Sequence, residues 1–363
     1  MRKSFLPSLG LLLLTGLSVG CGDSISSVTV SPTDARLIPT DTVRLSASAL
    51  DKDGMLLMNK TITWTSANDA VATVDADGLV TAVSDGVVNI TASSGGIAGT
   101  AEITVFTPAV LVLSNYLDGN EAIIDSFPVY ESHLTIDTMD VGSQTPGVAL
   151  LRQYDVVLLY EDGLFANSPN VGDSVAAYYQ AGGNVVIGTF YWQDRSDNTE
   201  YASRHGWGAL ETVDPFTAPE GAEYREDHLD TSSIVAHPIM AGVDSLYVDD
   251  YHGGVAAKTG TTVLARWSDM CTNCTATDND PLVGYLTGGN GQRMVGISAY
   301  PAYPLYGGFS GDFYRLWGNA LRWAAKGGPG PATTSAAAAV WAVPQPASAA
   351  GGAIVGGSRR GGK

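Results

Sequence analysis

Few side chains in this sequence combine the types and the spacing that catalysis requires. Glu161 directly follows an apolar run, where a carboxylate could act as a general acid or base, although a solvated loop carboxylate fits the same position. His237 and His252 are its candidate partners, and His237, which precedes a proline, also suits a turn residue. An extracytoplasmic hydrolase that uses Glu161 with His237 or His252 is therefore one interpretation.

The acidic run that ends in His252 offers potential metal ligands. Asp250 and His252 could both ligate an ion, but two ligands do not make a metal site, and no calcium loop of the D-x-D-x-D-G type occurs. We therefore predict no metal and no cofactor.

Two cysteines, Cys271 and Cys274, stand in C-x-x-C spacing. A redox pair usually opens a helix after a strand, whereas this pair lies in a polar stretch, and zinc would need two further ligands. Outside the cytoplasm the remaining interpretation is a small disulfide that closes a loop. We therefore predict a disulfide between Cys271 and Cys274.

The first 20 residues predict an export signal. Arg2 and Lys3 precede an apolar stretch that is too short for a bilayer, which needs about 20 residues. The residues before Cys21 resemble a lipobox, although Leu17 lies four positions before the cysteine instead of three. The resemblance implies a lipoprotein signal peptide at residues 1–20, lipidation of Cys21 and a short linker at 21–26; ordinary cleavage with a free thiol is the alternative.

The amino-acid composition restricts the classes of molecule that the chain is expected to bind. Acidic residues outnumber basic ones 37 to 19, which gives a formal net charge of −18. Such a chain repels phosphate backbones, so we expect no nucleic acid and membrane contact only through the lipid anchor. Residues 327–363 are rich in glycine, alanine and proline and predict a disordered low-complexity tail.

Residues 27–106 show the alternation of a β-sandwich. Valine, threonine and isoleucine recur with period two, and turns with Asp and Gly interrupt them. Residues 63–68, 71–75 and 78–82 resemble the group 2 bacterial immunoglobulin-like domain. That resemblance implies a cell-surface module with Trp64 in its core, used as a spacer or as an adhesion surface, and a single copy favours the spacer.

Residues 108–326 have a different pattern. Continuous apolar runs at 109–113, 155–160 and 184–188 are typical of buried parallel strands, and the helical pattern at 171–180 ends at a glycine pair. We predict a doubly wound, flavodoxin-like α/β domain with a parallel sheet, and therefore a multidomain chain. Further strands are expected at 262–265, 282–285 and 294–297, and a closing helix at 313–325.

Short segments of this second domain resemble the class I glutamine amidotransferase-like superfamily, in particular its trehalose-utilisation-like branch. They are residues 151–157, 178–188, 237–243 and 318–325. The family carries a catalytic cysteine after the strand that follows the glycine pair, whereas this chain has Thr189. Thr189 would need a base beside it to act as a nucleophile, so we expect it to be structural and expect no amidotransferase activity.

Polar and aromatic residues follow the predicted strands, where ligands bind in such sheets. Aromatic residues near Tyr300 could stack on sugar rings. The leading hypothesis is a non-catalytic envelope lipoprotein, extracytoplasmic and lipid-anchored, that recognises a glycan or a cell-wall component. The candidate cleft residues are Asn115, Glu161, Tyr191, Trp192 and Asp250.

Overall fold

The computed structural model describes residues 24–130, 133–163, 165–192, 206–223, 226–249, 252–268, 280–302 and 308–328. Cys21, Asp250, Cys271 and Cys274 lie outside these residues, as does nearly all of the predicted tail. The expected lipidation and the expected disulfide therefore stay predictions. Within the described residues, no helix is both long and apolar enough to cross a membrane.

The first domain consists of strands only. β1 (Ser27–Ser31) pairs with β4 (Ser46–Leu50). A four-stranded sheet has the order β2 (Asp34–Leu37), β9 (Ile97–Val105), β8 (Gly86–Ser94), β5 (Thr63–Ser66), and a three-stranded sheet has the order β3 (Thr42–Arg44), β7 (Leu79–Ala82), β6 (Ala72–Val74).

Alternate side chains of these strands point into one shared core. In β8, Val88, Ile90 and Ala92 are buried while the residues between them are more exposed, as a half-buried strand requires. Trp64 packs against this core from a partly buried position. At Gly78, which has φ +79°, an added Cβ would lie 2.9 Å from the Trp64 ring, so a turn with glycine is needed there.

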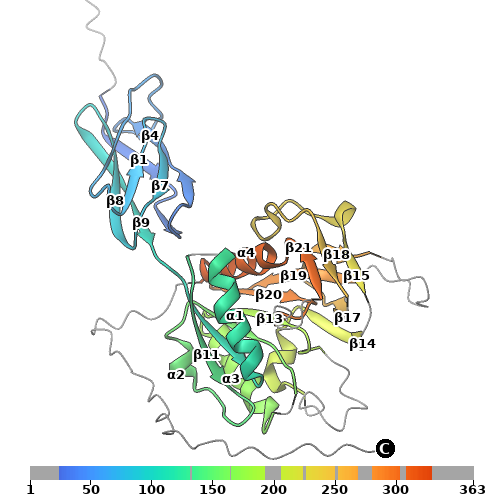
Figure 1. The fold of residues 1–363 in the computed structure, drawn as a ribbon. Coiled ribbons are helices and arrows are strands. Elements are labelled where there is room, and N and C mark those ends of the chain that lie inside the picture. Colours follow the sequence, from blue (N-terminus) through green and yellow to red (C-terminus); the bar gives the residue numbers. More distant parts are fainter. Residues whose placement is uncertain are drawn as a thin grey trace, which may run out of the picture. The chain divides into compact units, whose positions relative to one another are not determined.

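The second domain is built on a ten-stranded sheet (Figure 1). Five neighbouring strands at one end of this sheet are parallel, and one of them is supplied by the late part of the chain. In sheet order they are β11 (Thr135–Asp140), β10 (Ala109–Ser114), β12 (Val156–Leu159), β13 (Asn184–Gly188) and β20 (Arg293–Ile297).

The other half of the sheet is antiparallel, which corrects the prediction of a parallel, flavodoxin-like sheet throughout. The predicted late strands exist, but β19 reaches β20 through only residues 288–292, and a parallel pair needs a crossover of a dozen residues or more. Beyond β20 the order is β19 (Pro281–Thr287), β18 (Thr262–Trp267), β15 (Asp227–Asp230), β16 (Leu246–Val248) and β21 (Phe309–Gly311), while β14 (Phe216–Glu223) pairs separately with β17 (His252–Ala257).

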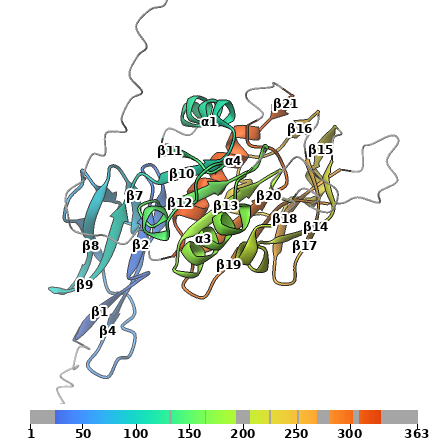
Figure 2. The same cartoon turned by 90° about the horizontal axis from the view of Figure 1, so that it is seen from below.

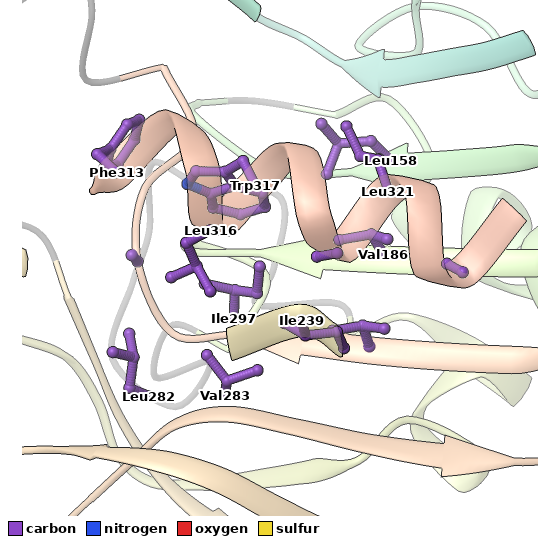
Figure 3. Packing of buried hydrophobic residues seen from close by; sticks show 14 of the residues in the cluster. Leu158, Val186, Ile239, Leu282, Val283, Ile297, Phe313, Leu316, Trp317 and Leu321 are labelled. Atoms are coloured by element: carbon purple, nitrogen blue, oxygen red, sulfur yellow. The ribbon is translucent and has the colours of Figure 1, made fainter. Parts of the chain in front are cut away.

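Helices cover both faces of the parallel strands, which explains their continuous apolar runs. In β10, Val110 and Val112 face a cluster that includes α1 (Leu117–Tyr130) and α4 (Phe313–Ala325), whereas Leu111 and Leu113 face a cluster that includes α3 (Ser168–Gln180). Figure 2 shows α3 and α4 with the sheet between them, and Figure 3 shows α4 packed onto β12 and β13. The helices are α1 (Leu117–Tyr130), α2 (Val148–Leu151), α3 (Ser168–Gln180) and α4 (Phe313–Ala325), with short 3₁₀ turns η2 (Gly208–Thr212), η3 (Thr231–Ser233) and η4 (Pro238–Met240).

Candidate functional site

The carboxyl ends of β12, β13 and β20 bring two candidate residues together. The Phe190 amide donates a hydrogen bond to the Glu161 carbonyl at 3.1 Å, and the Thr189 amide donates to the Ala299 carbonyl at 3.0 Å. Glu161 is fully buried and Thr189 is 1% exposed. The predicted neighbours at this edge are therefore adjacent, but they lie inside the protein.

Asn115 and Asp162 form part of the same edge. The Asn115 side-chain oxygen accepts a hydrogen bond from the Asp162 amide at 3.0 Å, and the Tyr300 hydroxyl donates to the Asp162 carboxylate. Burial raises the pKa of Asp162, and the hydrogen bond from Tyr300 opposes that shift. Asn115 thus orders the turn after β12, and its oxygen is already engaged.

The Thr189 side chain is positioned where the amidotransferase-like resemblance places a nucleophile. Its hydroxyl is buried and has no hydrogen-bond partner among the described residues. A threonine attacks only when a base removes its proton and the substrate can reach it. Thr189 is buried, and among the described residues no base lies within hydrogen-bond distance of its hydroxyl.

Tyr191 and Trp192 belong to the core cluster beneath α3. Tyr191 is fully buried, stacks on Trp207 with ring centroids 5.1 Å apart, and donates a hydrogen bond to Asp214 at 2.9 Å. Lys258 forms an ion pair with the same buried Asp214. Tyr191 and Trp192 were expected to line a cleft because both follow a strand. In the structure, side chains from η2 and β14 bury them. Asp214 and Lys258 carry no sequence signal, since they are 44 positions apart.

His237 lies away from Glu161. Its ring stacks on Tyr285 at 4.9 Å and meets the edge of Trp323 at 4.8 Å, near the end of α4. The end of α4 adjoins the start of β13, because Asn184 donates to the Gly327 carbonyl at 3.1 Å. His237 therefore packs toward the amino ends of the parallel strands, whereas Glu161 follows a carboxyl end.

The imidazole of His237 has a structural role at η4. Its Nδ1 accepts a hydrogen bond from the Ile239 amide at 3.2 Å, so it caps the first turn. Burial, followed by the charge of Arg293, lowers the pKa of His237. The Nδ1 lone pair of His237 is therefore already used by the backbone.

His252 and Asp250 are the remaining residues that the sequence suggested for a site. The backbone of His252 pairs with Glu223 in the β14–β17 ribbon. Among the described residues, no group of three His, Cys, Asp or Glu side chains is arranged to hold a metal ion. Asp250 lies outside those residues.

A surface pocket that the sequence did not predict lies across β15, β16 and β21. His228, Tyr247 and Ser310 form a cross-strand row, because each pairs in register with its neighbour. The His228 and Tyr247 rings lie 4.8 Å apart, and the Tyr247 hydroxyl donates to Glu226 at 3.2 Å. The pocket has a volume of about 390 Å³ and is lined by His228, Ser245, Leu246, Tyr247, Ser310 and Gly311.

The first domain can be classified from its sequence. Residues 24–105 match the family of bacterial Ig-like domains, group 2. Residues 24–105 are a group 2 Ig-like domain. A curated relative, Ice-binding protein 1 of Shewanella frigidimarina (strain NCIMB 400), is 34% identical over 104 residues. That match covers 28% of this chain and only 12% of the relative, so the chain spans a small part of its length.

Solved structures share partial likeness with the chain. Domains 5 and 6 of the S-layer protein SbsC share 19% identity with a TM-score of 0.22, over 23% of this chain and 45% of theirs. A ThuA-like protein from Bacteroides uniformis ATCC 8492 shares 15% identity with a TM-score of 0.39, over 60% of this chain and 91% of its own. At these scores neither likeness assigns a function, and the amidotransferase-like resemblance stays a prediction.

Proposed function

We propose that the protein is a lipid-anchored, extracytoplasmic binding protein. Its Ig-like domain is a spacer, and its α/β domain recognises a glycan or a cell-wall component without turning it over. The observation that carries this proposal is the environment of Thr189, which is 1% exposed and whose hydroxyl has no hydrogen-bond partner among the described residues. Group 2 Ig-like domains in residues 24–105 support a surface location.

The arrangement of acids and bases opposes the alternative of a hydrolase built on Glu161 and His237. General acid–base catalysis needs both groups within hydrogen-bond reach of one substrate. Glu161 is fully buried at a carboxyl end of the sheet, while His237 caps η4 and packs on Tyr285 and Trp323. The two side chains therefore do not converge on one cleft.

The pocket beside Tyr247 suits recognition of a polyol. Sugars present apolar ring faces that stack on aromatic side chains, and hydroxyls that exchange hydrogen bonds with polar groups. Here the His228 and Tyr247 rings supply the aromatic surface, Ser245 and Ser310 supply hydroxyls, and Glu226 supplies an acceptor beside the Tyr247 hydroxyl. We place glycan binding in this pocket.

Glycan-array and peptidoglycan-pulldown measurements on the mature chain test the proposal. We expect binding that Tyr247→Ala abolishes and that Tyr247→Phe weakens less, because phenylalanine keeps the ring. Tyr154→Phe is the matched control, since it removes a hydroxyl that donates to Asp137 in another part of the sheet.

Turnover assays on the retained glycans and on glutamine separate binding from catalysis. The binding proposal predicts no product above background with the wild type or with Thr189→Ala. Product formation that disappears in a folded Thr189→Ala or Glu161→Gln variant would show that the domain is an enzyme.

A further inference from the structure

The loop between β4 and β5 exposes a group of large hydrophobic side chains. Met55 is 66% exposed, Leu56 is 55% exposed and Met58 is 71% exposed, all within four consecutive positions. The other strongly exposed large hydrophobics of the described residues stand singly along the chain, which is ordinary for a protein surface. We call residues 51–60 the β4–β5 loop. Its exposed hydrophobic side chains form a group instead of standing singly.

Hydrogen bonds hold this loop in place. The Asp51 carboxylate accepts from the amides of Asp53 and Met55, each at 2.9 Å, and the Leu57 amide donates to the Ala49 carbonyl at 2.9 Å. Leu57 itself is buried. The loop is therefore anchored to the sandwich through Leu57 while its other apolar side chains face outward.

The register of β1 and β4 places this loop beside the start of the domain. Ser27 pairs with Leu50, and the Ser26 amide donates to the Leu50 carbonyl at 2.7 Å. Five residue steps separate Cys21 from Ser26, and an extended chain covers at most about 3.6 Å per residue, or roughly 18 Å. Figure 2 shows β1 and β4 side by side, with the loop extending past their common end.

We propose that the β4–β5 loop contacts the lipid bilayer, with Met55, Leu56 and Met58 inserted at the interface. Its location at the membrane rests on the proposed lipidation of Cys21. Lys52 and Lys60 balance Asp51 and Asp53, so the loop is neutral although the chain carries −18, and an anionic surface does not repel it. The apolar contact adds a second attachment beside the lipid and fixes the orientation of the Ig-like domain, so it revises the expectation that the anchor alone contacts the membrane.

Vesicle sedimentation with the mature chain carrying Cys21→Ser tests the loop without the lipid. The probe is a vesicle of phosphatidylcholine and phosphatidylglycerol. We expect measurable partition that Leu56→Ser weakens at least tenfold, because burying one such side chain contributes about 1.5–3 kcal/mol and about 1.4 kcal/mol is a factor of ten. The triple change Met55→Ser, Leu56→Ser, Met58→Ser should abolish it. Added salt should not weaken partition, because apolar burial drives it and salt only screens the repulsion between the acidic chain and the anionic vesicle.

A matched control removes other exposed apolar side chains of the same domain. Val83 and Val87 are 47% and 62% exposed, and Val83→Ser with Val87→Ser should leave partition unchanged. Absence of partition by the parent chain, or equal partition by the Leu56→Ser variant, would overturn the proposal.

Mass spectrometry of envelope-derived protein tests the anchor independently. Acylated Cys21 with no loop-dependent partition would refute the loop contact alone. Loop-dependent partition with an unmodified residue 21 would refute the anchor and retain the contact.

Discussion

Replacing Thr189 with valine tests the interpretation of the candidate site through stability. Valine matches threonine in shape and replaces the hydroxyl with a methyl group. Thr189 is 1% exposed and its hydroxyl has no partner among the described residues, and a buried polar group without a hydrogen bond costs about 1–3 kcal/mol. Thr189→Val should therefore raise the free energy of unfolding by about 1 kcal/mol, whereas most buried substitutions lower it.

Thr261→Val is the matched control for this prediction. The Thr261 hydroxyl donates to the Pro215 carbonyl at 2.7 Å, so the same change removes a hydrogen bond and should cost about 1 kcal/mol. Urea unfolding of the full chain, followed by tryptophan fluorescence, compares the midpoints, because the core of the α/β domain contains buried tryptophans.

Opposite outcomes would refute the reasoning. A Thr189→Val variant destabilised as much as Thr261→Val would mean that the Thr189 hydroxyl is hydrogen-bonded in solution. Loss of glycan binding without loss of stability would mean that this hydroxyl contacts the ligand.

Three further predictions concern packing and pH. Gly172→Ala should lower the free energy of unfolding measured in urea by about 1–3 kcal/mol, because the new Cβ would clash with the Trp207 carbonyl oxygen. This overpacking outweighs the roughly 1 kcal/mol by which alanine is preferred over glycine in a helix. Gly147→Ala is the control: it has open space around it and should change stability by less than about 0.5 kcal/mol. The lowered pKa of His237 means that the unfolded chain binds the proton more readily than the folded chain, so stability should fall as pH drops below about 6.5. His237→Asn keeps an N-cap acceptor and should reduce that loss in thermal melts at several pH values. The raised pKa of Asp162 has the opposite sign: stability should fall as pH rises from about 4 through the raised value, so Asp162→Asn should melt above the wild type at pH 7 and equal it at pH 3.

The sequence predicts four of the five strands of the parallel half, and physical reasons explain why. The exception is β11, which has no buried residue and therefore no apolar run. Each of β10, β12 and β13 is covered on both faces, so its apolar run is continuous and short, a pattern that few other elements produce. Helix α3 is also predictable, since Asn167 caps its start and Gly182 follows its end with φ +97°. The direction of the late strands depends on pairing partners, which periodicity does not encode.

The candidate site shows the limit of reasoning from strand ends. Tyr191 follows β13 as a cleft residue should, but Trp207 and Phe216 cover that position, and they come from segments without a clear period. The pocket formed by His228 and Tyr247 needs the register of two short antiparallel strands, which nothing in their sequences specifies. Residue types at strand ends therefore predict position along the sheet better than exposure to solvent.

The place of β20 in the sheet has a consequence for how the chain must fold. β20 lies between β13 and β19, and the Arg293 amide bonds to Asn184, 109 positions earlier. Until β20 has been synthesised, β13 has an open edge and the sheet cannot close. Such long-range pairing slows folding, which keeps the domain unfolded while most of the chain is being made. For the export that we propose, late closure of the sheet is an advantage, and any truncation before residue 293 should leave β13 exposed to aggregation.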